Sequence, residues 1–409
     1  MVDNLWERPL NEVMQQPDFV AQRPEDLERY REGDLLGFLL KLDEEQAELA
    51  SWRLNGPAII KGGPGTGGST VALFRVKSLL DRAEAAGQPA PRILFTTYTN
   101  VLTRFSEQLL KQLLGDRAHL VTVATADHLA RSIVERMEPV SDPVDPQSLT
   151  AVIDDVHARF VPPGRSDFER EMRRKALGGL RVDFLQAEFE WIIEGRSLTT
   201  LEEYLAAERT GRGIPLNAGM REAIWYLHQN VRGEIERKGL TTYWRVRNRA
   251  LDLVRSGMYR DRFDAVIIDE AQDLTPAALA LLVEVCRDPA GLYLTTDASQ
   301  SLYSRGFTWA RVHEQLQLRG RTALLRRNYR TSRAIAEAAS TFLRETGAGD
   351  PECLGQDHVH DGPRPVLYGF RSAQEQWQAT AKFIRDMARR FRLPAHAAAV
   401  LVPSKAAGE

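Results

Sequence analysis

Short apolar segments alternate with helical patterns through the first third of the chain. Residues 56–63, 91–99 and 119–125 have the composition of buried strands, and residues 69–87 and 101–115 between them have the apolar spacing of helices. Strands that alternate with helices in this way form parallel sheets, because each crossover helix returns the chain to the same edge. The sequence therefore predicts an α/β fold built on a parallel sheet.

This alternation stops near residue 140 and returns later. Residues 140–235 contain only helical patterns, which predicts a helical insertion. Four further segments are expected to contain strands: "FDAVIIDEA" (263–271), "AGLYLTTD" (290–297), and, in a new unit that opens with "RTALLRRNYR" (321–330), "PVLYGF" (365–370) and "AAAVLVP" (397–403). The chain of 409 residues is long enough for two or three domains, at roughly 100–200 residues each.

Composition excludes several classes of protein. The net charge of −2 gives no general basic surface, so any nucleic-acid contact has to be local. The two cysteines, Cys286 and Cys353, form no CxxC pair, which argues against a disulfide scaffold or a zinc site. No apolar run reaches the ~18 residues that span a bilayer, and the polar N-terminus is unlike a secretory signal. We therefore expect a cytoplasmic protein.

A glycine-rich stretch, "GGPGTGGST", lies between the first expected strand and the helix that follows it. Phosphate-binding loops have glycine, four residues, glycine, lysine and Ser/Thr in this context. Gly62, Gly67 and Ser69 match the pattern, but Gly68 stands at the lysine position. Backbone N–H groups at such a helix start can bind phosphate, and the Ser69 hydroxyl can bind Mg²⁺. Taken alone, the stretch is also compatible with a plain strand-to-helix turn.

The expected strand at 263–268 ends in two carboxylates, Asp269 and Glu270. Ligands of open α/β sheets bind outside the carboxyl ends of the strands. We expect Asp269 to hold Mg²⁺ and Glu270 to polarise the attacking water. The alternative is an acidic helix start, where carboxylates favour the helix dipole.

Two later stretches add polar and aromatic groups to this pattern. In "TTDASQSLY", Gln300 follows a strand end, and in "LRRNYRTSRAI", Tyr329 offers a flat face for adenine. Arg330 carries a guanidinium that is suited to a phosphate across a cleft. Taken singly, a loop glutamine and a solvated arginine are the more common interpretations.

Together, these stretches resemble the UvrD/Rep-type superfamily 1 DNA helicases, which are ATP-driven translocases on single-stranded DNA. The resemblance covers about residues 40–340 and rests on "LDEEQ", "GGPGTGGST", "LFTTYTN", "VIIDEAQD", "TDASQSLY" and "NYR". It implies catalytic roles for Glu270, Gln300 and Arg330, and Mg²⁺ ligation by Ser69 and Asp269. It implies nucleotide contacts from Gln46, Gly62, Gly63, Pro64, Gly65, Thr66, Gly67, Gly68, Ser69, Thr70 and Tyr329.

The resemblance also implies the architecture and the partners. ATP and Mg²⁺ would bind between two RecA-like domains, and single-stranded DNA or DNA junctions would lie across their tops. The expected divisions are an arm (1–30), a first RecA-like domain (31–135 and 236–318), the helical insertion (136–235) and an incomplete second RecA-like domain (319–409).

The resemblance implies DNA contacts from Thr97, Tyr98, Asn100, Phe307 and Trp309. Stacking of a base on an aromatic side chain is worth about 1–3 kcal/mol. For Phe307 and Trp309, plain packing is an equally good interpretation. The arginines between Arg311 and Arg333 are also candidates for phosphate contacts, although a solvated helix face is the commoner arrangement.

Three departures from the family pattern bear on activity. Gly68 replaces the phosphate-binding lysine. Asp127 stands where the family has a DNA-contacting histidine, and Thr296 replaces a glycine. The chain stops at Glu409, before the last two motifs of the family.

We therefore expect an ATP-dependent helicase or translocase with weak or absent hydrolysis. The alternative is a degenerate helicase-like module that binds nucleotide or DNA without turnover. A non-helicase P-loop enzyme is disfavoured by "QSLY" and "NYR".

Overall fold

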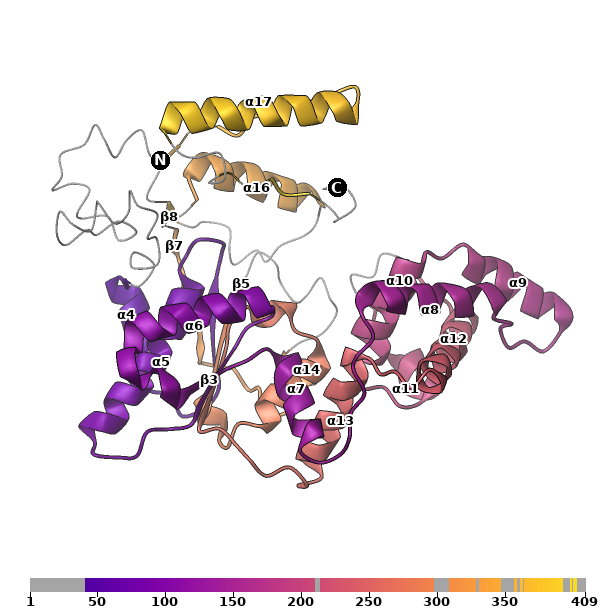
Figure 1. Cartoon of the computed structure of the whole chain (residues 1–409), viewed down its shortest axis with the longest axis horizontal. Coiled ribbons are helices and arrows are strands. Elements are labelled where there is room, and N and C mark those ends of the chain that lie inside the picture. Colours follow the sequence, from indigo (N-terminus) through magenta and orange to yellow (C-terminus); the bar gives the residue numbers. More distant parts are fainter. Residues whose placement is uncertain are drawn as a thin grey trace.

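The structure is a computed structural model, and it describes residues 41–209, 214–297, 309–328, 331–346, 357–358, 361–362, 364–392, 398 and 400–402. A six-stranded parallel sheet forms its centre (Figure 1). The strand order is β3 (Val121–Val123), β2 (Ile93–Thr96), β4 (Ala265–Ile268), β5 (Leu292–Asp297), β1 (Ala58–Gly62) and β6 (Thr322–Leu325). All five neighbouring pairs are parallel, which confirms the α/β fold.

Two helical layers cover the sheet because alternate strand residues face opposite sides. On one face, Ile60, Phe95 and Ile267 pack with helix α5 (Gly68–Ala85) and helix α6 (Asn100–Leu114). On the other face, Ile59, Leu94 and Ile268 pack with three helices: α7 (Ala126–Glu135), α13 (Tyr243–Arg255) and α14 (Pro276–Glu284). The strands are therefore apolar on both sides, as expected for a covered parallel sheet.

Short elements complete the sheet unit. Helix α4 (Glu44–Ala50) precedes β1 and contacts α5, and α15 (Trp309–Val312) contacts α14. Three 3₁₀ turns lie between the longer elements: η3 (Gly115–Leu120), η5 (Ala271–Asp273) and η6 (Pro289–Gly291).

A separate helical unit lies beside the sheet (Figure 1). Its elements are α8 (Pro146–Arg159), α9 (Asp167–Gly178), α10 (Val182–Glu188), the π-helical turn η4 (Phe189–Ile193), α11 (Leu201–Ala206) and α12 (Ala218–Arg237). These helices enclose a core of their own around Phe189, Tyr204 and Leu227. The helical pattern predicted between residues 140 and 235 is confirmed in the described residues.

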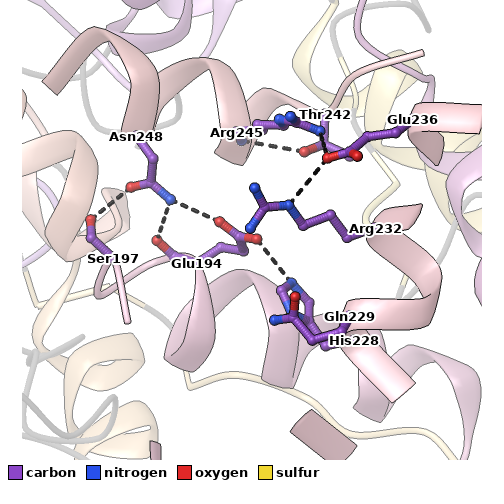
Figure 2. A network of polar contacts seen from close by, with 9 residues as sticks. All are labelled: Glu194, Ser197, His228, Gln229, Arg232, Glu236, Thr242, Arg245 and Asn248. Atoms are coloured by element: carbon purple, nitrogen blue, oxygen red, sulfur yellow. Dashed lines mark hydrogen bonds and ion pairs between the residues drawn. The ribbon is translucent and has the colours of Figure 1, made fainter. Parts of the chain in front are cut away.

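A polar network connects the helical unit to the sheet unit (Figure 2). Glu194 follows the π-helical turn and accepts a hydrogen bond of 2.8 Å from Asn248 of α13. Its other carboxylate oxygen lies 2.9 Å from Nε2 of His228 on α12. Ser197, with a left-handed φ of 54°, donates to Asn248 at 2.7 Å. The segment from Glu194 to Ser197 therefore joins α12 to α13.

The last part of the chain differs from the sequence expectation. We expected residues 321–330 to open a second domain, but β6 pairs with β1 at the edge of the first sheet. Beyond it lie β7 (Arg327–Asn328), which pairs with β8 (Asp357–His358), and helices α16 (Arg333–Thr346) and α17 (Ala373–Phe391).

The strand prediction for "PVLYGF" is wrong, because residues 365–370 are irregular. The described residues of "AAAVLVP" also have no strand structure. Leu367 is 97% exposed, and within the described part of the chain no strand pairs with residues 365–370. A strand needs such a neighbour to satisfy its N–H and C=O groups.

Among the described residues, no helix is both long and apolar enough to span a membrane.

Candidate functional site

The glycine-rich stretch forms a closed loop between β1 and α5. Gly65 and Gly67 adopt left-handed backbone angles, with φ of 88° and 86°, and Gly67 is the N-cap of α5. The Thr66 hydroxyl donates to the Gly63 carbonyl oxygen at 2.9 Å, and its backbone N–H donates to the same oxygen at 3.2 Å. The loop therefore wraps around the first turn of an 18-residue helix, whose N–H groups can receive an anion.

Gln46 of α4 holds this loop by a hydrogen bond to its backbone. Its Nε2 donates to the Thr66 carbonyl oxygen at 2.9 Å, while its Oε1 accepts from the backbone N–H of Asp43 at 3.1 Å. Glycine is favoured at position 67 because its φ of 86° is strained for other residues, and an added Cβ would also lie 2.5 Å from Gln46 Nε2. The Gln46 side chain, expected to contact the nucleotide, is buried and holds the loop in this structure.

Gly68 is not required by the backbone. It is the first residue of α5, and a Cβ added there would meet only the Cβ of Thr295, at 3.8 Å. The backbone at this position therefore accepts a side-chain Cβ. Ser69 and Thr70 follow in the first turn of the helix.

Asp269 lies at the end of β4, directly beside the loop. Its carboxylate accepts hydrogen bonds from the Thr295 hydroxyl, at 2.6 Å, and from the Ser69 side chain. Burial raises the pKa of Asp269, and these two hydrogen bonds oppose the rise. The structure thus brings together the two residues expected to bind Mg²⁺. One carboxylate and one hydroxyl fit Mg²⁺, which usually keeps phosphate and water as its other ligands.

Glu270 follows in a strained backbone conformation, with φ of 55°. Burial, together with the nearby charge of Asp269, raises the pKa of its side chain. Gln272 donates to the Glu270 carboxylate at 2.5 Å and accepts a hydrogen bond from the backbone N–H of Asp297 at 3.0 Å. Gln272 therefore orients Glu270 and ties it to the end of β5.

Three supporting residues were missed in the sequence: Gln272, Thr295 and Asn328. Asn328 is buried on β7, and its Nδ2 donates to the Pro64 carbonyl oxygen at 2.8 Å. Each of them lies within one of the stretches on which the resemblance rests or directly beside it, so closeness to these motifs could have pointed to them. Which group each side chain contacts depends on strand pairing.

Four expected site residues, Gln300, Phe307, Tyr329 and Arg330, lie outside the described residues. Of the remaining DNA candidates, Tyr98 and Asn100 are exposed just after β2, with Tyr98 at 49%.

Two other expected DNA contacts are not supported by the structure. The Thr97 side chain is buried, and its hydroxyl lies 3.3 Å from the carbonyl oxygen of Thr99 and 3.3 Å from the hydroxyl of Thr103. Trp309 packs against the core as a partly buried side chain, which supports the packing interpretation.

Several of the later arginines have partners within the protein. Arg311 pairs with Glu208, Arg333 pairs with Asp361 at 3.1 Å, and Arg321 donates to the Pro57 carbonyl oxygen at 3.0 Å. These contacts agree with the interpretation of solvated or structural arginines rather than a row of phosphate contacts.

Comparison with known proteins adds the family. A family model described as an AAA domain matches residues 46–305, well over half of the chain. The chain is 22% identical over 327 residues to the ATP-dependent DNA helicase PcrA of Staphylococcus aureus, and 22% identical over 329 residues to that of Staphylococcus epidermidis. Each alignment covers 76% of this chain, but the chain spans only 41% of the relative's length. With its glycine loop, paired carboxylates and parallel sheet, the chain belongs to the UvrD/Rep-type superfamily 1 helicase family.

Proposed function

We propose that this chain is the nucleotide-binding part of a helicase-like protein, which binds Mg–ATP at the glycine loop and single-stranded DNA at the same sheet edge, and hydrolyses ATP slowly. The observation that carries the proposal is Gly68, which stands at the position of the family's phosphate-binding lysine, next to a loop where Ser69 and Asp269 lie together. Its relatives are named ATP-dependent DNA helicases, which supports the choice of nucleotide and of DNA.

Nucleotide binding is supported by the geometry of the loop. The first-turn N–H groups of α5 and the helix dipole favour a phosphate in front of Gly67 and Gly68. Ser69 and Asp269 would hold Mg²⁺, which neutralises charge on the phosphates when it is bound. Glu270 would orient the attacking water, with its own position set by Gln272.

Slow hydrolysis follows from the missing charge. A hydrogen bond to a charged group contributes about 1.5–3 kcal/mol, so binding is weakened by roughly 10- to 100-fold without the lysine. The loss in the transition state is larger, since phosphoryl transfer is catalysed mainly by positioning and electrostatics. Loss of the lysine at position 68 therefore weakens ATP binding less than it slows ATP hydrolysis.

A second candidate function rests on the same residue. A module that binds nucleotide or DNA without turnover would regulate a partner rather than move along DNA. The two functions differ in one measurable property, which is the rate of ATP hydrolysis when single-stranded DNA is added.

The proposal keeps the division into two RecA-like domains with a helical insertion. It places the arm at 1–30 and the insertion at 136–235. Because β6 pairs with β1, the expected end of the first domain at 318 moves to Leu325, so the first domain comprises 31–135 and 236–325 and the second begins at 326. The described RecA-like sheet would then have six strands, from β1 to β6.

The test compares the natural chain with Gly68→Lys. We expect the natural chain to bind Mg–ATP weakly and to hydrolyse it at a rate that single-stranded DNA barely changes. Gly68→Lys should bind nucleotide at least 10-fold more tightly. Gly68→Ala is the matched control, because it adds a side chain without a charge.

Strong DNA-stimulated turnover by the natural chain would show an active motor and refute the slow-hydrolysis proposal. Equal nucleotide affinity of Gly68→Lys and Gly68→Ala would show that the loop does not bind phosphate as described.

A further inference from the structure

Arg247 of α13 lies against the start of α7 and is held there by several acceptors. Its Nε donates to one oxygen of Asp127, and its Nη2 lies 3.3 Å from the other oxygen. Its Nη1 lies 3.4 Å from the Thr275 hydroxyl, and Glu190 lies 4.0 Å from Nη2. Both Asp127 carboxylate oxygens thus accept hydrogen bonds from the guanidinium, in the bidentate geometry that arginine also uses for phosphate.

This pair lies at the carboxyl edge of the sheet. Asp127 is in the first turn of α7, which follows β3, and Thr275 caps α14, which follows β4. Both line one cavity with Tyr98, which follows β2. Ligands of open parallel sheets bind at this edge, and the half-exposed Tyr98 ring offers a stacking surface there.

The charge balance at this edge is unfavourable for DNA. Asp127, Glu190 and Asp273 line the same cavity as Arg247, and two of these three carboxylates, Asp127 and Glu190, lie against its guanidinium. Burial raises the pKa of Glu190, Arg247 opposes that rise, and Asp127 adds to it. The Arg247 side chain is 12% exposed and that of Asp127 is 35% exposed, so the carboxylate is the more accessible partner.

We propose that Asp127 occupies the position on Arg247 that a phosphate of single-stranded DNA would otherwise take, and so lowers the affinity of this chain for DNA. The inference rests on the proposed function, because it takes single-stranded DNA as the ligand of this edge. Arg247 can then contact DNA only when its hydrogen bonds to the Asp127 carboxylate are broken. A neutral residue at position 127 removes the competitor and one repulsive charge together.

The experiment measures binding of a fluorescent oligothymidylate by anisotropy at several salt concentrations, for the natural chain and Asp127→Asn. We expect Asp127→Asn to bind about 10-fold more tightly at low salt, as expected when one close charge contact is gained. The slope of log affinity against log salt should steepen by about 0.7, the value for one further phosphate contact on a single strand. Asp127→Asn combined with Arg247→Gln should lose the gain.

Asp261→Asn is the matched control. Asp261 also pairs with two arginines, Arg92 and Arg136, but it lies ahead of β4, at the opposite edge of the sheet. Its replacement should leave DNA affinity unchanged. Thermal unfolding and Mg–ATP binding verify that each variant is folded, and Asp127→Ser replaces Asp127→Asn if the latter unfolds.

Two outcomes overturn the inference in different ways. If the natural chain binds the oligonucleotide and Asp127→Asn binds it equally well, Asp127 does not compete with DNA phosphate for Arg247. The proposed DNA function then still stands. If neither protein binds DNA at low salt although both bind Mg–ATP, the DNA part of the proposed function fails, and the inference fails with it.

Discussion

The side-chain amide of Asn328 donates a hydrogen bond of 2.8 Å to the carbonyl oxygen of Pro64. This contact joins the glycine loop to β7, which follows the last strand of the sheet by two residues. Asn328 also accepts a hydrogen bond of 2.8 Å from the backbone N–H of Thr331. One buried side chain therefore contacts both the glycine loop and the backbone of Thr331.

We predict that Asn328→Ala weakens Mg–ATP binding and lowers the free energy of unfolding by about 1–3 kcal/mol, because two backbone groups lose their partner. Calorimetric titration and urea unfolding measure the two effects. Asn230→Ala is the control, since Asn230 is exposed and bonds only within its own helix. Equal effects of both substitutions would contradict a role for Asn328 in the loop.

The two neighbouring glycines of the loop should respond oppositely to alanine. Gly67→Ala places a Cβ in a left-handed conformation and 2.5 Å from Gln46 Nε2, so we expect a loss of at least about 1–2 kcal/mol in stability. Gly68→Ala lies in a helix with open space, so we expect a gain of about 0.5–1 kcal/mol. Thermal unfolding of both variants checks the loop geometry. A stable Gly67→Ala protein would show that the loop is built differently.

Asp269, the proposed Mg²⁺ ligand, should destabilise the nucleotide-free protein. Burial raises its pKa above the ordinary value of 3.8, so the folded protein binds the proton more tightly than the unfolded chain. Stability then falls as the pH rises from this ordinary value through the folded pKa. We predict that Asp269→Asn raises the unfolding temperature at neutral pH and flattens this part of the pH profile.

The same substitution should abolish the Mg²⁺ dependence of nucleotide binding, because the amide carries no charge. Unfolding scans from about pH 4 to 7 and titrations with and without Mg²⁺ measure the two effects. An unfolding temperature below that of the natural chain at neutral pH would show that the hydrogen bonds from Thr295 and Ser69 outweigh the cost of burial.

Glu194 should hold the helical unit to the sheet unit (Figure 2). We predict that Glu194→Ala costs about 1–3 kcal/mol, since Asn248 and His228 lose an acceptor that is only 13% exposed. Hydrogen exchange should accelerate in α12 while Mg–ATP binding is unchanged. Glu236→Ala, which removes a carboxylate that is 45% exposed in the same network, should cost less than about 1 kcal/mol.

The pH dependence of this contribution has a defined sign. Burial raises the pKa of Glu194, but hydrogen bonds from His228 and Asn248 outweigh it, so the net shift is below the ordinary value of 4.5. The stabilisation is therefore present above that pH and is lost as the pH falls through the folded pKa. An effect of Glu194→Ala that is undiminished in strong acid would contradict this assignment.

Local patterns were sufficient to predict much of the sheet unit. The strands at β1 to β5 are short apolar runs, and the glycines and carboxylates that follow them lie at one edge, where the sequence places them. The prediction was wrong at residues 365–370, because an apolar run becomes a strand only beside a neighbouring strand. It also misplaced β6, since no local signal says which sheet a strand joins.

The sequence alone determined the α/β class, the helical segment between residues 140 and 235 and the position of the glycine loop, because these depend on periodicity and on glycine geometry within a few residues. Only the tertiary structure decided which side chains support the site. Asn328 reaches Pro64, and Asp127 reaches Arg247, across 264 and 120 residues of chain. Such contacts depend on strand order and helix packing, and these are set by burial of the whole core rather than by any local pattern.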